Sequence, residues 1–372
     1  MNQWTFPTKI YAGEDSLQRL TEFNNESILI ICDPFLKDSP NLTHVMSLMD
    51  SKNKVTIYTD VVPDPPITHV VKGIEFMEGI KPTFIIAIGG GSCIDMSKGI
   101  AYFGRKLKHM DIKSFIAIPT TSGTGSEVTS FAVLTDSETQ IKYPLVDDAV
   151  LPDEALLTPL FVKTSPPNVT AFSGMDVLVH ALEAYVATAA NNFTDALAQQ
   201  AIELVFEYLP KCHKPTATEH DRMSMHEASC LAGLSFNRAG LGIVHAMAHQ
   251  LGAQFHVPHG LANSMLLPHV IGFNCSRNPA VAKKYAHLSA KLGFAAHNAS
   301  DSDKLVALIE AIVTLQHTLN CPMNLTAFGV DKAISESKLN LMADRALEDM
   351  CYRFNPYPAS HEDLISLYKK VL

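Results

Sequence analysis

Four of the chain's sixteen histidines, His245, His249, His256 and His259, lie within one stretch of fifteen residues. Imidazole nitrogens and carboxylate oxygens are common ligands of catalytic divalent metal ions, and a single helix rarely supplies a complete ligand set. His245 and His249 are four residues apart, so their side chains share one face of a helix. This stretch is therefore one half of a candidate metal site.

The other candidate half lies well upstream, where Asp176 and His180 are also four residues apart. If these two helical faces converge, their oxygen and nitrogen donors, with no thiolate among them, would form a site for a single metal ion. The alternative is that these are ordinary packed histidines, which is the commoner explanation for any single one of them. Spacing alone leaves open which of the four clustered histidines bind.

A glycine-rich turn, Gly89–Ser92, follows an apolar run at residues 84–88, and Asp95 comes next on a helical pattern. Glycines between a strand and a helix allow a diphosphate to approach the backbone and the free N–H groups of the helix. The turn is not Gly-x-Gly-x-x-Gly, so the usual dinucleotide fingerprint is absent, and a plain turn is an equal alternative on this feature alone.

Two further loops favour a nucleotide site. Asp33 follows the apolar run 27–32, where a carboxylate can accept the ribose hydroxyls and would repel a 2′-phosphate. Residues 120–127 combine hydroxyls and glycines directly after another apolar run. The alternatives are a turn-forming Asp before Pro34 and a flexible linker. All three loops leave the carboxyl ends of strands, the side on which open α/β sheets bind ligands.

Composition excludes several function classes. The 372-residue chain is 47% apolar and carries a net charge of −9 without a basic run, which argues against a nucleic-acid partner. We expect no signal peptide, because no basic region followed by an apolar region stands at the N-terminus. We expect no membrane span, because no apolar stretch reaches about 20 residues. Seven scattered cysteines without a Cys-x-x-Cys pair are typical of reduced thiols in a cytoplasmic protein.

The pattern of apolar residues divides the chain in two. Buried strands are predicted at residues 27–32, 55–58, 83–88 and 115–118, in alternation with helices. Longer amphipathic helices are predicted at residues 195–209, 224–234, 279–292 and 301–319. We therefore predict a doubly wound α/β domain with a parallel sheet at residues 1–158 and an all-helical domain at residues 159–372.

Several long segments together resemble the iron-dependent (group III) alcohol dehydrogenases, and the resemblance covers essentially the whole chain. The segments are Gly89-Gly-Gly-Ser-Cys-Ile-Asp95-Met-Ser-Lys98, Pro119-Thr-Thr-Ser-Gly-Thr-Gly-Ser-Glu127, Gly174-Met-Asp-Val-Leu-Val-His180, and Gly242 through Gly260. The resemblance implies the dehydroquinate synthase-like fold of that family. Within it, the chain is most similar to the short 1-propanol dehydrogenases of bacterial propanediol utilisation and to their ethanolamine-pathway relatives.

By motif position, the resemblance implies that Asp176, His180, His245 and His259 are the metal ligands. It implies that His249 is a catalytic proton-relay residue rather than a ligand. The implied metal is Fe(II), although Zn(II) or Mn(II) would suit the same donors.

The resemblance also implies NAD as the cofactor. Together with the loop analysis, the expected cofactor-binding residues are Asp33, Gly89, Gly90, Gly91, Ser92, Asp95, Thr120, Thr121, Ser126, Val128 and Lys142. Three residues fall where relatives line the alcohol pocket, with core packing as the alternative: Phe131, Phe236 and Cys351.

Three positions depart from the pattern of the family. Asp64 and Arg238 stand where relatives commonly carry Asn, and Tyr357 replaces a frequent Arg. These departures put in doubt a cofactor contact at Asp64 and an anionic-substrate role at Tyr357. Arg238, two helical turns before His245, could reshape the substrate pocket.

The expected reaction is interconversion of a short-chain aldehyde and a primary alcohol, propanal/1-propanol or acetaldehyde/ethanol, by hydride transfer to or from NAD. One alternative keeps the fold and changes the substrate to a diol or polyol such as lactaldehyde, 1,3-propanediol or glycerol. Another is a metallohydrolase or lyase, which leaves the three nucleotide loops unexplained. We expect a homodimer or larger homo-oligomer in the cytoplasm, in or near a bacterial microcompartment with its shell or co-encapsulated enzymes.

Overall fold

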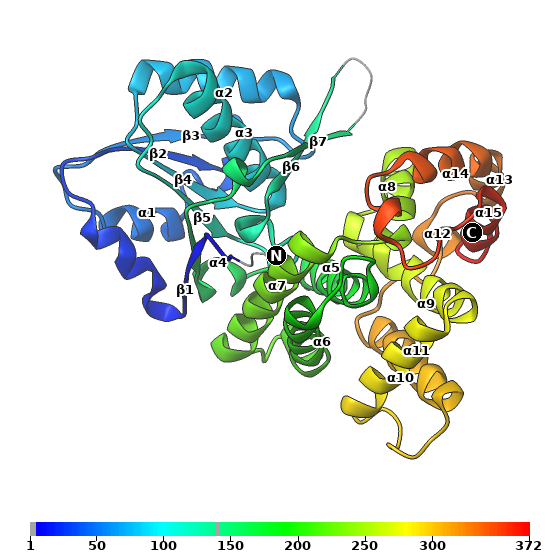
Figure 1. Cartoon of the computed structure of the whole chain (residues 1–372). Coiled ribbons are helices and arrows are strands. Elements are labelled where there is room, and N and C mark those ends of the chain that lie inside the picture. Colours follow the sequence, from blue (N-terminus) through cyan, green and yellow to red (C-terminus); the bar gives the residue numbers. More distant parts are fainter. Residues whose placement is uncertain (1–4, 138–141) are drawn as a thin grey trace. The chain divides into compact units, whose positions relative to one another are not determined.

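A six-stranded parallel sheet organises the first part of the chain (Figure 1). The computed structural model describes residues 5–137 and 142–372, with Lys142 described by its backbone only. The sheet consists of β1 (Lys9–Ala12), β2 (Ser27–Cys32), β3 (Lys54–Tyr58), β4 (Phe84–Gly89), β5 (Ser114–Pro119) and β8 (Glu154–Leu157). Their order across the sheet is β1-β8-β5-β4-β2-β3, and every neighbouring pair is parallel. The prediction of a parallel sheet is confirmed.

The central strands are apolar on both faces because helices cover both faces (Figure 1). Alternate residues point to opposite sides, so Leu29 and Ile31 pack with α2 (Ile67–Ile80) and α3 (Gly91–Lys108). Ile28 and Ile30 pack on the other face with α1 (Pro40–Ser47) and the 3₁₀ segment η1 (Glu14–Glu22). The continuous apolar runs that predicted these strands are therefore a consequence of burial on two sides.

Four strands were not predicted from the sequence. β1 and β8 are only four residues long, β1 is mostly exposed at the sheet edge, and β8 begins with a glutamate, so neither gives a long apolar run. The other two, β6 (Phe131–Thr135) and β7 (Lys142–Val146), form a separate antiparallel hairpin. Short 3₁₀ segments complete this part at Pro34–Leu36, Ser126–Val128 and Asp148–Val150.

The chain divides into two compact units, Met1–Ser165 and Pro166–Leu372. The short helix α4 (Pro159–Val162), which follows the predicted boundary after residue 158, lies in the first unit, and its Phe161 packs in the core on one face of the sheet. The second unit consists of helices: α5 (Pro167–Val186), α6 (Asn192–Cys212), α7 (Glu219–Ala239), α8 (Ile243–Phe255), α9 (His259–Arg277), α10 (Pro279–Lys291), α11 (Asp301–Thr318), α12 (Leu325–Phe328), α13 (Lys332–Ser337), α14 (Leu339–Glu348) and α15 (His361–Lys369), with a 3₁₀ turn at Tyr352–Phe354.

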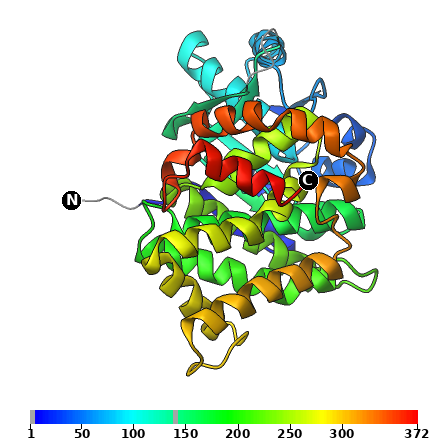
Figure 2. The same cartoon turned by 90° about the vertical axis from the view of Figure 1, so that its right-hand side faces the viewer.

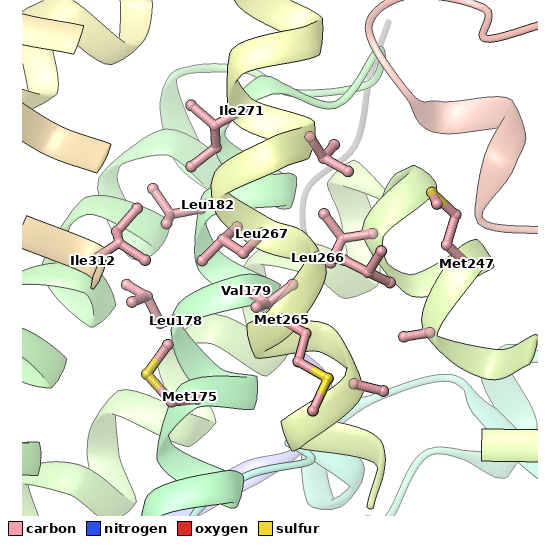
Figure 3. Close-up of a cluster of buried hydrophobic side chains, with 14 of the residues drawn as sticks. Met175, Leu178, Val179, Leu182, Met247, Met265, Leu266, Leu267, Ile271 and Ile312 are labelled. Carbon is pink, nitrogen blue, oxygen red and sulfur yellow. The ribbon is translucent and has the colours of Figure 1, made fainter. Parts of the chain in front are cut away.

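Helices α5 and α9 form the centre of the second unit. Figure 3 shows Leu178 and Leu182 of α5 beside Leu267 of α9, with Ile312 of α11 next to them. Towards the chain end, α14 and α15 pack together and α14 packs on α8, as Figure 2 shows in orange, red and yellow-green. The four helices predicted here correspond to α6, α7, α10 and α11, and residues 166–372 contain no strand.

The predicted fold class, a parallel α/β part followed by a helical part, is confirmed. Among the described residues, no helix is both long enough and apolar enough to cross a membrane.

Candidate functional site

Helix α5 carries three ionisable side chains on one face. Asp176, His180 and Glu183 follow at spacings of four and three residues, so they lie one above the other along the helix. Each residue is at most 5% exposed. Buried ionisable groups require partners, so this face must meet complementary groups from elsewhere in the second unit.

Helices α8 and α9 bring those groups. His245 lies in the first turn of α8, and His259 is the first residue of α9. Gly260 makes this arrangement possible, because a Cβ at that position would lie 2.7 Å from the carbonyl carbon of Phe172 on α5 and 3.1 Å from Cβ of Asp176. The start of α9 therefore passes directly against α5, and His259 reaches Asp176.

The structure brings Asp176, His180, His245 and His259 together, with one potential ligand atom of each within 4.8 Å of all the others. Oδ1 of Asp176 lies 3.8 Å from Nε2 of His245 and 3.6 Å from Nε2 of His259. Two atoms bound to one ion in tetrahedral geometry are about 3.4 Å apart, so these separations are close to those of a shared ion. The rings of His180 and His245 stack with centroids 4.6 Å apart.

The chemistry of the donor set fits a divalent ion. Burial holds the pKa of His245 well below its ordinary value, and the neighbouring His180, His259 and His249 lower it further. His245 is therefore neutral and has a lone pair to donate. One carboxylate and three imidazoles suit Fe(II), Zn(II) or Mn(II).

His249 lies beside this group and has a different partner. Its Nδ1 is 2.7 Å from Oδ2 of Asp349, and its ring stacks on His259 with centroids 5.4 Å apart. Burial acts to raise the pKa of Asp349, but donors from His249 and Cys351 outweigh it, and the pKa is lowered overall. Asp349 is therefore an anion that orients the His249 imidazole.

The remaining clustered histidine, His256, ends α8. It adopts a left-handed conformation with φ of 54°, and its N–H donates to the carbonyl of Gly252. Its position after the last turn of α8 gives it a capping role.

Sequence reasoning missed three residues that contact the clustered histidines or Asp176. Oε2 of Glu183 lies 2.5 Å from Nδ1 of His245, and Oδ2 of Asp349 lies 2.7 Å from Nδ1 of His249. Asn263, one turn after His259 on α9, donates from Nδ2 to Oδ1 of Asp176 at 2.7 Å. The same amide nitrogen is 3.1 Å from Nε2 of both His245 and His259. Helical spacing from Asp176 and His259 could have indicated Glu183 and Asn263, whereas Asp349 is too distant in sequence to find in this way.

In the first unit, the predicted glycine turn begins α3 beside Asp33. Oδ2 of Asp33 accepts from the N–H of Gly90 at 3.3 Å. A Cβ at Gly89 would lie 2.7 Å from that same oxygen, which explains the glycine there. Burial raises the pKa of Asp33, and the Gly90 N–H opposes this effect. Asp33 thus stands at the carboxyl end of β2, next to the N-terminus of α3.

The loop after β5 is attached to the same helix. Thr120 donates its N–H to the carbonyl of Gly89, and the hydroxyl of Ser126 donates to Asp95 at 2.6 Å. The second oxygen of Asp95 accepts from the N–H of Val133. Asp95, predicted to contact the cofactor, therefore binds protein donors and holds this loop on α3.

The other predicted cofactor residues lie in these loops. Gly91 starts α3 close to Thr124, and Ser92 accepts from the backbone N–H of Asp64 at 3.3 Å. Thr121 is half-buried and Val128 is buried. The side chain of Lys142 lies outside the described residues.

A buried lysine next to these loops has no counterpart in the predictions. Lys98 is 0% exposed and donates to the carbonyls of Thr129 and Phe131 at 2.8 and 2.7 Å. Burial lowers its pKa to about 8, opposed by Asp95 and Glu127. Burial also raises the pKa of Glu127 to about 7. Lys98 fixes the backbone that leads from the loop into β6.

The three predicted pocket residues lie in different places. Phe131 is half-buried in β6 of the first unit. Phe236 of α7 is 3% exposed and stacks on His180 with centroids 4.4 Å apart. Cys351 lies beside Asp349, and burial together with that carboxylate raises the pKa of its thiol well above the ordinary value. Cys351 is therefore a neutral thiol next to the histidine group.

Two of the three departures have a structural account. Asp64 has a φ of 49°, a left-handed conformation that Asn and Asp both tolerate, so the exchange preserves the turn. Tyr357 packs edge-on against Phe273 with centroids 5.9 Å apart.

Comparison with known proteins identifies the family. Residues 7–159 match the iron-containing alcohol dehydrogenase family, and residues 170–372 match the C-terminal part of the Fe-containing alcohol dehydrogenase family. The chain belongs to the iron-containing alcohol dehydrogenases. It is therefore an oxidoreductase that interconverts alcohols and carbonyl compounds, and membership leaves the hydrolase and lyase alternative without support.

Three proteins show how similar the relatives are. The chain is 44% identical to a 1-propanol dehydrogenase, PduQ, of Salmonella typhimurium, over the full length of both. It is 37% identical to an NADPH-dependent butanol dehydrogenase of Clostridium saccharobutylicum, over 100% of this chain and 98% of that protein. Among solved structures, a 1,3-propanediol oxidoreductase superposes with a TM-score of 0.91 at 31% identity and covers 100% of both chains.

Proposed function

We propose that this iron-containing alcohol dehydrogenase uses one catalytic divalent ion, held by Asp176, His180, His245 and His259, to interconvert a short-chain aldehyde and a primary alcohol with NAD(H). The observation that carries the proposal is the convergence of four ligand atoms within 4.8 Å, from three helices of the second unit. We infer Fe(II) from the family, and the donors also suit Zn(II) or Mn(II).

The protein supplies position and proton transfer. A divalent ion at this site would act as a Lewis acid towards the oxygen of the substrate. His249, oriented through Nδ1 by Asp349, has its Nε2 available to move the proton to or from that oxygen. Phe236 covers one face of His180, so it excludes water on that side. The neutral thiol of Cys351 is the proposed further contact of the alcohol in the second unit.

We propose NAD(H) rather than NADP(H) as the cofactor. A relative depends on NADPH, so family membership alone does not fix this choice. The support is Asp33, whose carboxylate stands where the ribose of a nucleotide on the Gly89–Ser92 turn would lie. A carboxylate there accepts the ribose hydroxyls and repels a 2′-phosphate.

For the substrate, we propose propanal/1-propanol or acetaldehyde/ethanol. The support is the 44% identity over the full length to a 1-propanol dehydrogenase. A diol such as 1,3-propanediol is a second candidate, favoured by the likeness to the 1,3-propanediol oxidoreductase.

The experiment that tests the function is anaerobic reconstitution of the metal-free protein with Fe(II), followed by measurement of NADH oxidation with propanal. Elemental analysis of the four alanine variants accompanies it. Each variant at Asp176, His180, His245 or His259 should lose metal and activity together, because three remaining ligands do not hold the geometry. A variant that keeps stoichiometric metal would remove that residue from the ligand set.

We also propose that the protein is a homodimer or larger homo-oligomer that works with the enzymes of a bacterial microcompartment. The support is the resemblance to propanediol-utilisation dehydrogenases. Sedimentation of the purified protein as a monomer, or its absence from purified microcompartments, would contradict these points.

A further inference from the structure

Glu183 connects the candidate metal site to the beginning of α8. It is the third ionisable residue on the inner face of α5, after Asp176 and His180. Its Oε2 lies 2.5 Å from Nδ1 of His245, and its Oε1 accepts from the backbone N–H of Val244 at 2.7 Å. One carboxylate therefore binds both the side chain of a proposed ligand and the helix that carries it.

The surroundings hold this carboxylate in one place. A Cβ at Gly242 would lie 2.7 Å from Oε1 of Glu183 and 2.8 Å from Oδ1 of Asn355, so only glycine allows this approach. Asn355 accepts from the N–H of Ile243 at 3.3 Å and exchanges two hydrogen bonds with Asn274. The free N–H groups at the start of α8 are thus divided between Glu183 and Asn355.

This arrangement determines which nitrogen of His245 carries the proton. Oε1 of Glu183 accepts from a backbone N–H, so an ionised Glu183 leaves Oε2 as the acceptor for Nδ1–H of the ring. A neutral imidazole has a single N–H, and with the proton on Nδ1 the lone pair is on Nε2. Nε2 is the atom that lies 3.8 Å from Oδ1 of Asp176.

We propose that Glu183 is a positioning residue of the metal site, which fixes the Nδ1–H tautomer of His245 so that Nε2 is always ready to bind the ion. Ligating histidines commonly donate their second N–H to such a partner, and loss of that partner typically weakens metal affinity about 10–100-fold. The inference rests on the ligand set proposed above. It goes beyond that set because Glu183 itself does not touch the ion.

The competing explanation is purely structural, with Glu183 as a cap for α8. Under that explanation, any acceptor at the position of Oε1 would be enough to cap α8, and the tautomer of His245 would have no effect on metal binding. Glu183→Gln separates the two, because glutamine has the same shape and keeps one acceptor oxygen for Val244. Its NH₂ group then faces Nδ1 of His245, which forces the ring proton onto Nε2 and blocks the ligand position.

The test compares metal dissociation constants by chelator competition. Glu183→Gln should bind Fe(II) or Zn(II) roughly 10–100-fold more weakly than the wild type. Asn355→Ala is the matched control, since it removes the other partner of the α8 N-terminus without touching a ligand side chain. Asn355→Ala should lower the free energy of unfolding. Its metal dissociation constant should differ from that of the wild type by less than about threefold. Equal losses in both variants, or none in Glu183→Gln, would overturn the proposal.

A second measurement covers the case in which Glu183→Gln does not fold. Nitrogen NMR of histidine-labelled, metal-free wild type, with His245→Ala to assign the signal, reports the tautomer directly. We expect His245 with a protonated Nδ1 and an unprotonated Nε2, and the reverse would refute the inference. Metal retained by His245→Ala would instead refute the ligand set, so the two failures are distinguishable.

Discussion

Replacing Gly260 with alanine should damage the metal site although the residue has no side chain to bind anything. The added Cβ would lie 2.7 Å from the carbonyl carbon of Phe172, and closer still to its oxygen. Ordinary contacts begin at 3.4 Å, so α9 must move away by at least the 0.7 Å between these distances. The backbone of α5 at Phe172 is held within its helix and cannot shift, so the start of α9, where His259 lies, must be displaced.

The size of the effect follows from the tolerance of metal coordination. Ligand distances in metal sites hold to within about 0.2 Å, so a movement of this size detaches His259 or distorts the site. We expect metal affinity to fall at least about tenfold. The overpacked contact should also lower the free energy of unfolding by about 1–3 kcal/mol.

Gly272→Ala is the control for this prediction, because Gly272 is on the same helix and a Cβ there would meet nothing within 4 Å. It should leave metal affinity unchanged and stabilise the protein by up to about 1 kcal/mol, the usual gain of alanine over glycine in a helix. Chelator titration and urea denaturation of both variants measure these quantities. If Gly260→Ala binds metal as tightly as Gly272→Ala, then the close approach of α9 to α5 does not set the position of His259, and the reasoning is wrong.

Three further predictions concern other parts of the protein. His249→Ala should keep its metal by elemental analysis while turnover falls about 10²–10⁴-fold and its pH profile changes, and an empty site would make His249 a ligand. Asp349→Asn, which removes the anion that orients His249, should have the same effects more weakly. Asp33→Gly should reduce the preference for NADH over NADPH by roughly tenfold or more in steady-state assays, and a wild type that uses both equally would contradict the role of Asp33. Burial raises the pKa of Glu127 from 4.5 to about 7, so the folded protein binds this proton more tightly than the unfolded chain and loses stability as pH rises from 4.5 to 7. The melting temperature of Glu127→Gln minus that of the wild type should therefore be larger at pH 8 than at pH 5. An equal difference at both pH values would refute the burial argument.

The sequence predicted the parts of the fold that leave a local pattern. The strand predicted at residues 27–32 has the bounds of β2. The strand predicted at 55–58 differs from β3 by one residue at one end, and those predicted at 83–88 and 115–118 differ from β4 and β5 by one residue at each end. Burial on both faces makes these segments apolar throughout, so the pattern is visible without the structure. β1 and β8 are short edge or near-edge strands that depend on pairing with neighbouring strands, β1 with β8 and β8 also with β5, and no local pattern records such pairing.

The surroundings of Lys98 also could not be predicted from a local sequence pattern. Lysine on a helical pattern predicts an exposed side chain, yet Lys98 is fully buried and binds the backbone at Thr129 and Phe131. Only the packing of α3 against the loop before β6 creates a buried set of acceptors for it. The departure from the rule is a property of the tertiary structure and not of the residues near Lys98 in sequence.

By itself, the sequence determined which side chains share a helix face: Asp176 with His180, and His245 with His249. Helical geometry fixes these relations, because residues four apart lie on one side of any α-helix. The resemblance to a family then implied which histidines belong together, but it gave no physical reason. Only the tertiary structure supplied one, because the packing of α9 on α5 through Gly260 places His259 beside Asp176. The same packing decided the partners that local spacing could not assign, Glu183 for His245 and Asp349 for His249. Contacts between residues far apart in sequence depend on the shape of whole helical surfaces, and a spacing rule describes only one helix at a time.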